Sequence, residues 1–112
     1  MEIKNAKIES TTLGYEDHGI FTFMLHLDYG HSGQGFGGYA LDEPKPPLDR
    51  LRVDRQGTAM GMQVIIEILN TVGVQNWEDL PGQYIRVEAD HTKVIRIGHL
   101  LEDKWFDMAD LQ

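Results

Sequence analysis

One helical pattern stands in the middle of a chain whose other apolar segments alternate as strands do. Between Thr58 and Val72, apolar residues recur at the three- and four-residue spacing of one helix face. Thr58 can cap the first turn, and Gly73 stands where a left-handed residue commonly ends a helix. We expect this helix to pack on the apolar face of a sheet. Its apolar stripe consists of Met62, Ile65, Ile66, Leu69 and Val72, and Val64 and Ile68 widen it.

Strand patterns lie on both sides of the helix. The clearest runs from Ile20 to Tyr29, where every second residue from Phe21 to Leu27 is apolar. A weaker strand over 2–11 and a turn over 13–19 precede it, which predicts an antiparallel hairpin. Further strands are expected over 36–41, 83–89 and 93–101, with the turn Asp90-His91-Thr92 joining the last two.

The resulting element order is β-β-β-α-β-β within a single α+β domain of 112 residues. It predicts a twisted antiparallel sheet with one long helix packed on one face. Two segments stand outside this scheme. Residues 43–56, which hold three of the four prolines, predict a surface loop, and residues 102–112 form a C-terminal tail.

Composition narrows the classes of function. The chain has no cysteine, which removes thiol catalysis and cysteine-ligated metals and favours a reducing compartment. A net charge of −8 disfavours phosphate backbones and anionic membrane surfaces as partners. The first residues lack the apolar core of a signal peptide, and no apolar run approaches the roughly 20 residues that span a bilayer. We therefore expect a cytoplasmic protein that binds neither nucleic acid directly nor membranes.

Glycines crowd the segment from Gly30 to Gly38. A phosphate-binding loop requires a helix N-terminus directly after it, whereas a strand is expected here. Glycines inside a strand mark a bulge or a close approach of another backbone. The segment therefore predicts contact with another subunit or with a ligand.

His26, Asp28 and His31 form an H-x-D-x-x-H cluster. His26 and Asp28 share one face of a strand, as two ligands of one metal would, and His18 could join them across the hairpin. The same residue types are ordinary on the polar face of a strand. We therefore predict no metal site, no cofactor and no catalytic residue, and keep a small metal-dependent hydrolase as an alternative hypothesis.

Aromatic residues mark two candidate interfaces. Trp105 and Phe106 in the tail either fold back on the core or anchor a second subunit, because large aromatics are enriched at interfaces. Phe36 and Tyr39 lie beside the glycines of the third strand, and an uncovered strand edge can pair with another chain. These four residues are the interface candidates of a homo-oligomer, most simply a two-fold dimer.

Four runs of the sequence resemble a group of small proteins encoded in tailed phages and prophages. They are Tyr15-Glu16-Asp17-His18-Gly19-Ile20-Phe21-Thr22, the segment from Leu27 to Tyr39, the segment from Val72 to Gly82, and Ile97-Gly98-His99-Leu100-Leu101-Glu102-Asp103-Lys104-Trp105-Phe106. The resemblance extends over nearly the whole chain. It implies a genomic setting, and with it the cytoplasm of a bacterial host cell, but no activity and no site residue.

These observations together favour a non-enzymatic phage or prophage accessory protein that acts by binding. The expected target is a host or defence-system protein, or a small signalling molecule held between subunits. The alternatives are the metal-dependent hydrolase described above and a structural or assembly component of the virion.

Overall fold

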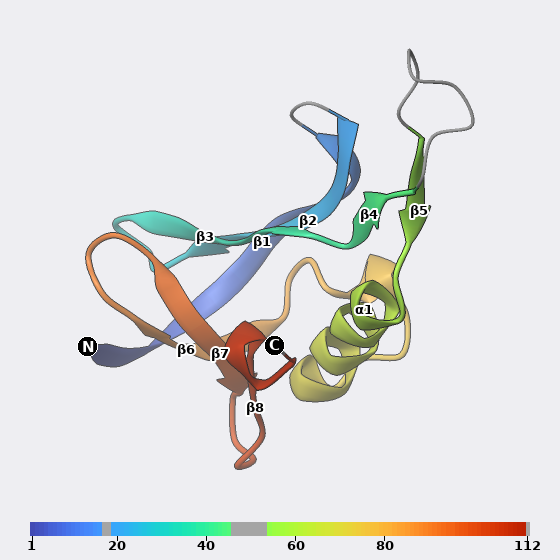
Figure 1. The fold of residues 1–112 in the computed structure, drawn as a ribbon. Helices are drawn as coiled ribbons and strands as arrows, with labels where there is room; N and C mark the ends of the chain where they lie inside the picture. The colour runs from blue at the N-terminus through green and yellow to red at the C-terminus, as the bar shows by residue number, and fades with distance from the viewer. Residues whose placement is uncertain (17–18, 46–53, 112) are drawn as a thin grey trace.

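The computed structural model describes residues 1–16, 19–45 and 54–111 (Figure 1). In these ranges, six strands form one antiparallel sheet in the order β3-β2-β1-β6-β7-β8, and β4 pairs with β5. The expected α+β class is confirmed, whereas the expected order lacked the three short strands β4, β5 and β8. The elements are β1 (Glu2–Glu16), β2 (Ile20–Asp28), β3 (Gly33–Ala40), β4 (Asp42–Pro44), β5 (Arg55–Gly57), α1 (Ala59–Val72), η2 (Trp77–Asp79), β6 (Tyr84–Ala89), β7 (Val94–His99), β8 (Trp105–Asp107) and η3 (Met108–Leu111).

The long strand β1 belongs to both halves of the sheet. Its residues 2–7 pair with β6, and its residues 7–16 pair with β2. Between the two halves the register shifts, because Ile8 and Ser10 face consecutive residues of β2 and leave Glu9 as an extra residue. A bulge of this kind bends the strand and increases its twist. β1 therefore turns the sheet from one half into the other.

The bend brings the two edges of the sheet together. In a flat sheet β3 and β8 would lie five strand spacings, roughly 24 Å, apart. Instead, the ring centroids of Phe36 in β3 and Phe106 in β8 are 6.2 Å apart. The sheet is thus curled around its own core, and α1 covers one end of it (Figure 1). The fully buried core side chains include Ile8, Phe23, Leu25, Phe36, Val64, Ile68, Leu80, Ile85, Val87 and Ile97.

The connectivity of the five longest strands matches that of the OB-fold, a partly open five-stranded Greek-key arrangement. β1 pairs with both β2 and β6, β3 follows β2, β7 follows β6, and the helix connects β3 to β6. β3 and β7 run parallel and contact one another without pairing. Because one fold supports many functions, this likeness assigns none.

The predicted helix is confirmed at both ends. The Thr58 side chain accepts a hydrogen bond from the Gly61 amide at 2.8 Å, and Gly73 ends the helix with a φ of 92°. The predicted buried face is displaced, since Met62 is 62% and Ile66 42% exposed. The buried residues of the helix are Gly61, Val64, Ile68, Thr71 and Val72, and Ile65 and Leu69 are partly buried against the core.

Gly61 explains why the helix is rotated from the expected orientation. A Cβ atom at this position would lie 2.1 Å from the carbonyl oxygen of Leu41. The first turn of α1 therefore packs directly on the backbone between β3 and β4, and the face centred on Gly61 points inward. Hydropathy alone included Met62 and Ile66 in the stripe and left out Gly61, because a glycine contributes little to an apolar pattern.

The C-terminal tail folds back on the sheet. Residues 105–107 form β8 beside β7, and Phe106 and Met108 are buried in the core. The strand expected over 93–101 ends earlier, at His99, and Leu101 beyond it is 85% exposed. An extra residue at Ile95 shifts the register between β6 and β7, so that Val94 and Ile97 both face inward.

The other strand boundaries also differ from expectation. β1 continues through the expected turn to Glu16, and β3 begins at Gly33 instead of at Phe36. The expected loop over 43–56 is described only at its two ends, where Glu43 pairs with Gln56 in the β4–β5 hairpin. Residues 46–53 lie outside the described residues.

We predict that Gly61→Ala destabilises the protein by about 1–3 kcal/mol, the usual range for overpacking a filled site. At a free helical position the same change would stabilise by about 1 kcal/mol. The free energies of unfolding of the Gly61→Ala variant and the wild type, measured in urea, give the size and sign of the change. Gly57→Ala is the control, because a Cβ there meets no atom within 4 Å. A Gly61→Ala variant as stable as the wild type would show that α1 does not rest on Leu41.

Candidate functional site

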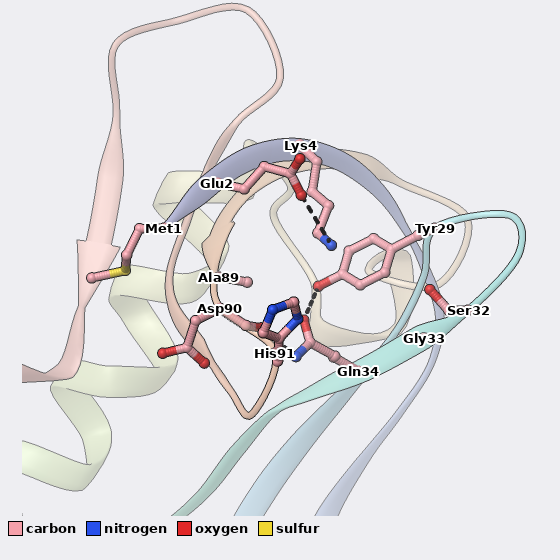
Figure 2. Close-up of a pocket in the computed structure, with 10 residues that line it drawn as sticks. All are labelled: Met1, Glu2, Lys4, Tyr29, Ser32, Gly33, Gln34, Ala89, Asp90 and His91. Carbon is pink, nitrogen blue, oxygen red and sulfur yellow. Dashed lines mark hydrogen bonds and ion pairs between the residues drawn. The ribbon is translucent and has the colours of Figure 1, made fainter.

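A cavity lies where the start of β3 approaches the turn between β6 and β7 (Figure 2). Its volume is about 550 Å³, which is within the range of small-molecule sites. The curl of the sheet creates this cavity, because its walls come from both halves. The lining residues are Met1, Glu2, Lys4, Tyr29, Ser32, Gly33, Gln34, Ala89, Asp90 and His91.

Lys4 and Tyr29 form one wall of the cavity. The Lys4 ammonium lies 4.2 Å from the centroid of the Tyr29 ring, a cation–π contact. The same ammonium lies 3.6 Å from the carboxylate of Glu2. Figure 2 shows the Lys4 side chain reaching across the cavity toward the Tyr29 ring. This wall therefore presents an ammonium, a carboxylate and part of an aromatic ring close together in space.

A chain of hydrogen bonds joins the opposite walls. The Tyr29 hydroxyl donates to the Gln34 side-chain oxygen at 2.5 Å, and the Gln34 amide donates to the Asp90 carbonyl at 3.0 Å. Burial raises the pKa of Tyr29, so its phenol stays protonated and remains a donor at neutral pH. Gln34 thus connects the sheet edge β3 to the β6–β7 turn.

The Asp90 carboxylate shapes the turn that closes the cavity. Its Oδ1 accepts hydrogen bonds from the Lys93 amide and from both the amide and the hydroxyl of Thr92, at 2.8–2.9 Å. These hydrogen bonds lower the pKa of Asp90 to about 2, and the bond from the Lys93 amide has the largest effect. The carboxylate therefore stays ionised and structural at neutral pH, and the turn presents the His91 ring beside Gln34 (Figure 2).

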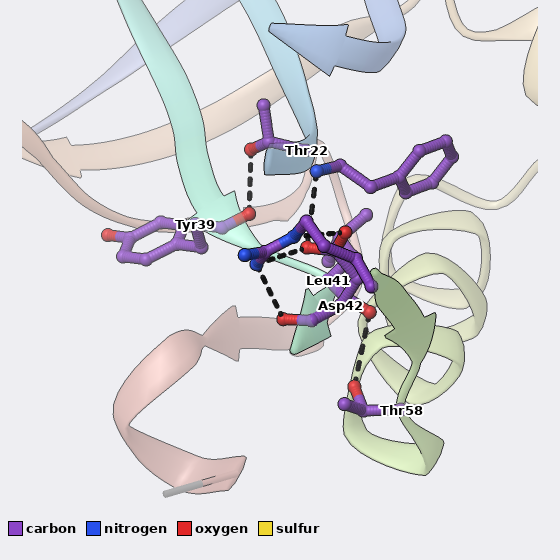
Figure 3. A network of polar contacts seen from close by, with 7 residues as sticks. Thr22, Tyr39, Leu41, Asp42 and Thr58 are labelled. Atoms are coloured by element: carbon purple, nitrogen blue, oxygen red, sulfur yellow. Dashed lines mark hydrogen bonds and ion pairs between the residues drawn. The ribbon is translucent and has the colours of Figure 1, made fainter. Parts of the chain in front are cut away.

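A second polar network lies around the β4–β5 hairpin (Figure 3). The Arg55 guanidinium binds the buried carboxylate of Asp42 at 2.8 Å, and this bond holds the pKa of Asp42 below its usual range. Asp42 also accepts from the amide of Phe21, and the carbonyl of Leu41 accepts from the hydroxyl of Thr58. The network ties the β4–β5 hairpin and the start of α1 to β2, so we assign it a structural role.

The candidate metal ligands of the alternative hypothesis do not gather into a site. His26 and His31 are exposed, and the Asp28 carboxylate accepts a hydrogen bond from the amide of Gly30 at 2.7 Å. Within residues 1–16, 19–45 and 54–111, no three histidine, cysteine, aspartate or glutamate side chains lie close enough to share a metal ion. His18, the fourth candidate, lies outside the described residues.

The four interface candidates have different surroundings. Phe36 and Phe106 are 1% and 3% exposed, so both rings belong to the core of their own chain. The partly buried Tyr39 ring packs against Phe36 at 6.0 Å. Trp105 remains half-exposed at the edge of the sheet. An interface argument therefore keeps only Tyr39 and Trp105.

The glycines of β3 are explained within the chain. A Cβ at Gly33 would lie 2.7 Å from the Leu27 carbonyl oxygen, and one at Gly37 would lie 2.3 Å from that of Phe23. Gly35 leaves room for the sulfur of Met24. The expected close approach is present, and the approaching group is β2 of the same chain. The glycines therefore no longer indicate a second subunit.

Comparisons with protein-family models, with curated proteins and with solved structures give no match. In the part of the chain that the structure describes, no helix is long and apolar enough to cross a membrane. The role of the site therefore has to be inferred from its geometry. Sequence reasoning missed it because Lys4, Tyr29, Gln34 and His91 form no local motif and meet only through the curl of the sheet.

We predict that Asp90→Ala lowers the melting temperature at neutral pH and that this deficit shrinks in acid. The pKa of Asp90 is lowered from 3.8 to about 2 on folding, so its stabilising contribution is complete above pH 3.8 and is lost as pH falls through about 2. Thermal melting curves of the wild type and of Asp90→Ala across this pH range measure how the deficit changes. Asp103→Ala, which removes an exposed carboxylate, is the control. A deficit that stays constant with pH would contradict the assigned role of the carboxylate.

Proposed function

We propose that this protein is a non-enzymatic binding protein that holds a small polar molecule in the cavity beside Tyr29. The observation that carries the proposal is the cavity itself, of about 550 Å³, whose polar groups converge from β1, β3 and two turns. Cavities of this size with a few placed polar groups are the usual form of a ligand site.

The polar groups favour a ligand that both donates and accepts hydrogen bonds. The Lys4 ammonium and the Gln34 amide are donors, and the Glu2 carboxylate is an acceptor. The cavity thus pairs a cation with anions, and the whole chain carries a charge of −8. A hydroxylated or amide-bearing molecule of low charge suits this lining better than a polyanion does.

The state of the titratable groups favours binding over catalysis. Asp90 is held ionised by its hydrogen bonds, and the Tyr29 phenol is held protonated by burial. A general acid or base needs a pKa near the working pH. Both shifts move away from neutral pH, so these two groups are suited to hold a ligand and a turn in place.

The setting that we propose is the cytoplasm of a bacterial host, in which a phage or prophage accessory protein would bind a small signalling molecule. The resemblance of four sequence runs to small phage-encoded proteins supports it. A host or defence-system protein is the other class of target, and it requires an exposed recognition surface in place of a cavity. The cavity favours the small molecule.

We predict that the protein purified from bacterial cells retains a small molecule that Gln34→Ala loses. Removing this side chain breaks both hydrogen bonds that join the cavity walls. Mass spectrometry of compounds released on denaturation is the measurement. Gln56→Ala is the matched control, because Gln56 is an exposed glutamine of the β4–β5 hairpin. No retained compound, or the same compounds on all three proteins, would contradict the proposal.

We also predict a homodimer, because closed two-fold dimers are the commonest assemblies of small proteins. Sedimentation equilibrium at micromolar concentration decides between one and two chains of 12.8 kDa. A single species at the mass of one chain would contradict the dimer.

A further inference from the structure

The outer face of the β1-β6-β7-β8 half of the sheet carries an ordered set of basic and aromatic side chains. The strand register places Lys7 beside Tyr84, and places Arg86, Gly98 and Trp105 in one row across three strands. The next row runs Ile3, Glu88, Arg96 and Asp107. We call this the tryptophan face; it comprises Ile3, Lys7, Tyr84, Arg86, Glu88, Arg96, Trp105 and Asp107.

Trp105 is held flat at the centre of the tryptophan face. A Cβ at Gly98 would lie 2.6 Å from the Trp105 ring, so the indole rests directly on the backbone of β7. The guanidinium carbons of Arg86 and Arg96 lie 4.7 Å and 4.2 Å from the ring centroid. The indole thus has a fixed position against two cations and is partly buried.

The two arginine side chains are also held in place by hydrogen bonds and an ion pair. Arg86 donates to the carbonyls of His99 and Glu102, each at 2.8 Å, and Arg96 binds the Glu88 carboxylate at 3.0 Å. Side chains that are already ordered lose little entropy when a partner binds. The tryptophan face is therefore preorganised, unlike a surface of free lysines.

The residue types are those that dominate protein interfaces. Trp, Tyr and Arg are the side chains most enriched at the energetic centres of such interfaces. Tyr84 is 58% exposed and Ile3 is 54% exposed on this face. Beside Tyr84 a hollow of about 260 Å³ has room for an apolar side chain. Its other lining residues are Asn5, Ala6, Lys7, Asp28, Tyr29 and Gly30.

The charge of the tryptophan face is opposite to that of the chain. Its three cations, Lys7, Arg86 and Arg96, outnumber its two anions in a protein with a net charge of −8. An acidic partner is complementary to this face. A second copy related by a two-fold axis would bring a face of the same net charge against it, and a nucleic acid would be repelled by the remaining surface.

We propose that the tryptophan face is a docking surface for an acidic, partly apolar segment of a partner protein. Acidic side chains of the segment pair with Lys7 and with the free N–H groups of the arginines, and an apolar side chain enters the hollow beside Tyr84. The hollow adjoins the cavity, since Tyr29 lines both, but the proposal does not depend on the function proposed for the cavity.

The test uses a peptide of alternating glutamate and leucine as the probe, with backbone amide and indole shifts of the full chain as the readout. We expect saturable shifts confined to residues 3–7 of β1, the residues beside the hollow, β6, β7, β8 and the Trp105 indole. Lys7→Glu should weaken binding about tenfold, in the range for a charge reversal at an interface. Lys45→Glu, the same change at an exposed position in a different part of the chain, should leave binding within about twofold. Tyr84→Ala should weaken binding without unfolding the protein.

Four results would overturn the proposal. The first is no shift on the tryptophan face at millimolar peptide. The second is equal binding of a lysine–leucine peptide, which would show that binding does not depend on the sign of the peptide's charge. The third is equal weakening by Lys7→Glu and Lys45→Glu. The fourth is tighter binding of single-stranded oligothymidine, or self-association through the same residues, because either would assign the face to another class of partner.

Discussion

The contact between the two edges of the sheet is the interaction on which the rest of the structure depends. β3 and β8 are the outermost strands, and Phe36 and Phe106 nevertheless meet across the core at 6.2 Å. The bulge at Glu9 lets β1 serve both halves and directs the curl that makes this contact possible. Without the curl, neither an enclosed core nor the cavity beside Tyr29 would exist, because each takes its walls from both halves.

Sequence patterns predicted the elements better than their arrangement. The alternation from Phe21 to Leu27 and the capped helix were visible locally, because each depends on neighbours a few residues away. The short strand β8 was not, since three residues carry too little periodicity to read. The buried face of α1 was misplaced for a related reason: it is set by the contact of Gly61 with Leu41, a pair 20 residues apart with no apolar signature.

The candidate site escaped prediction altogether. Gln34 lies in the glycine-rich segment from Gly30 to Gly38 and Tyr29 directly precedes it, and their partners Lys4 and Asp90 are distant in the chain. The histidines that sequence reasoning singled out are instead exposed and separate. Tertiary contacts thus supply one polar cavity and one preorganised basic face to an acidic protein. We propose that the cavity holds a small polar ligand and that the basic face docks an acidic segment of a partner.

The curl of the sheet can be tested directly by nuclear Overhauser effects between aromatic ring protons. The account predicts cross-peaks between the rings of Phe36 and Phe106, as strong as those between Phe23 and Phe36, whose centroids lie 5.9 Å apart. The Phe23–Phe36 pair joins adjacent strands and serves as the internal reference. A spectrum that shows the reference peaks and lacks those between Phe36 and Phe106 would mean that the edges lie apart. It would contradict both the core and the cavity described here.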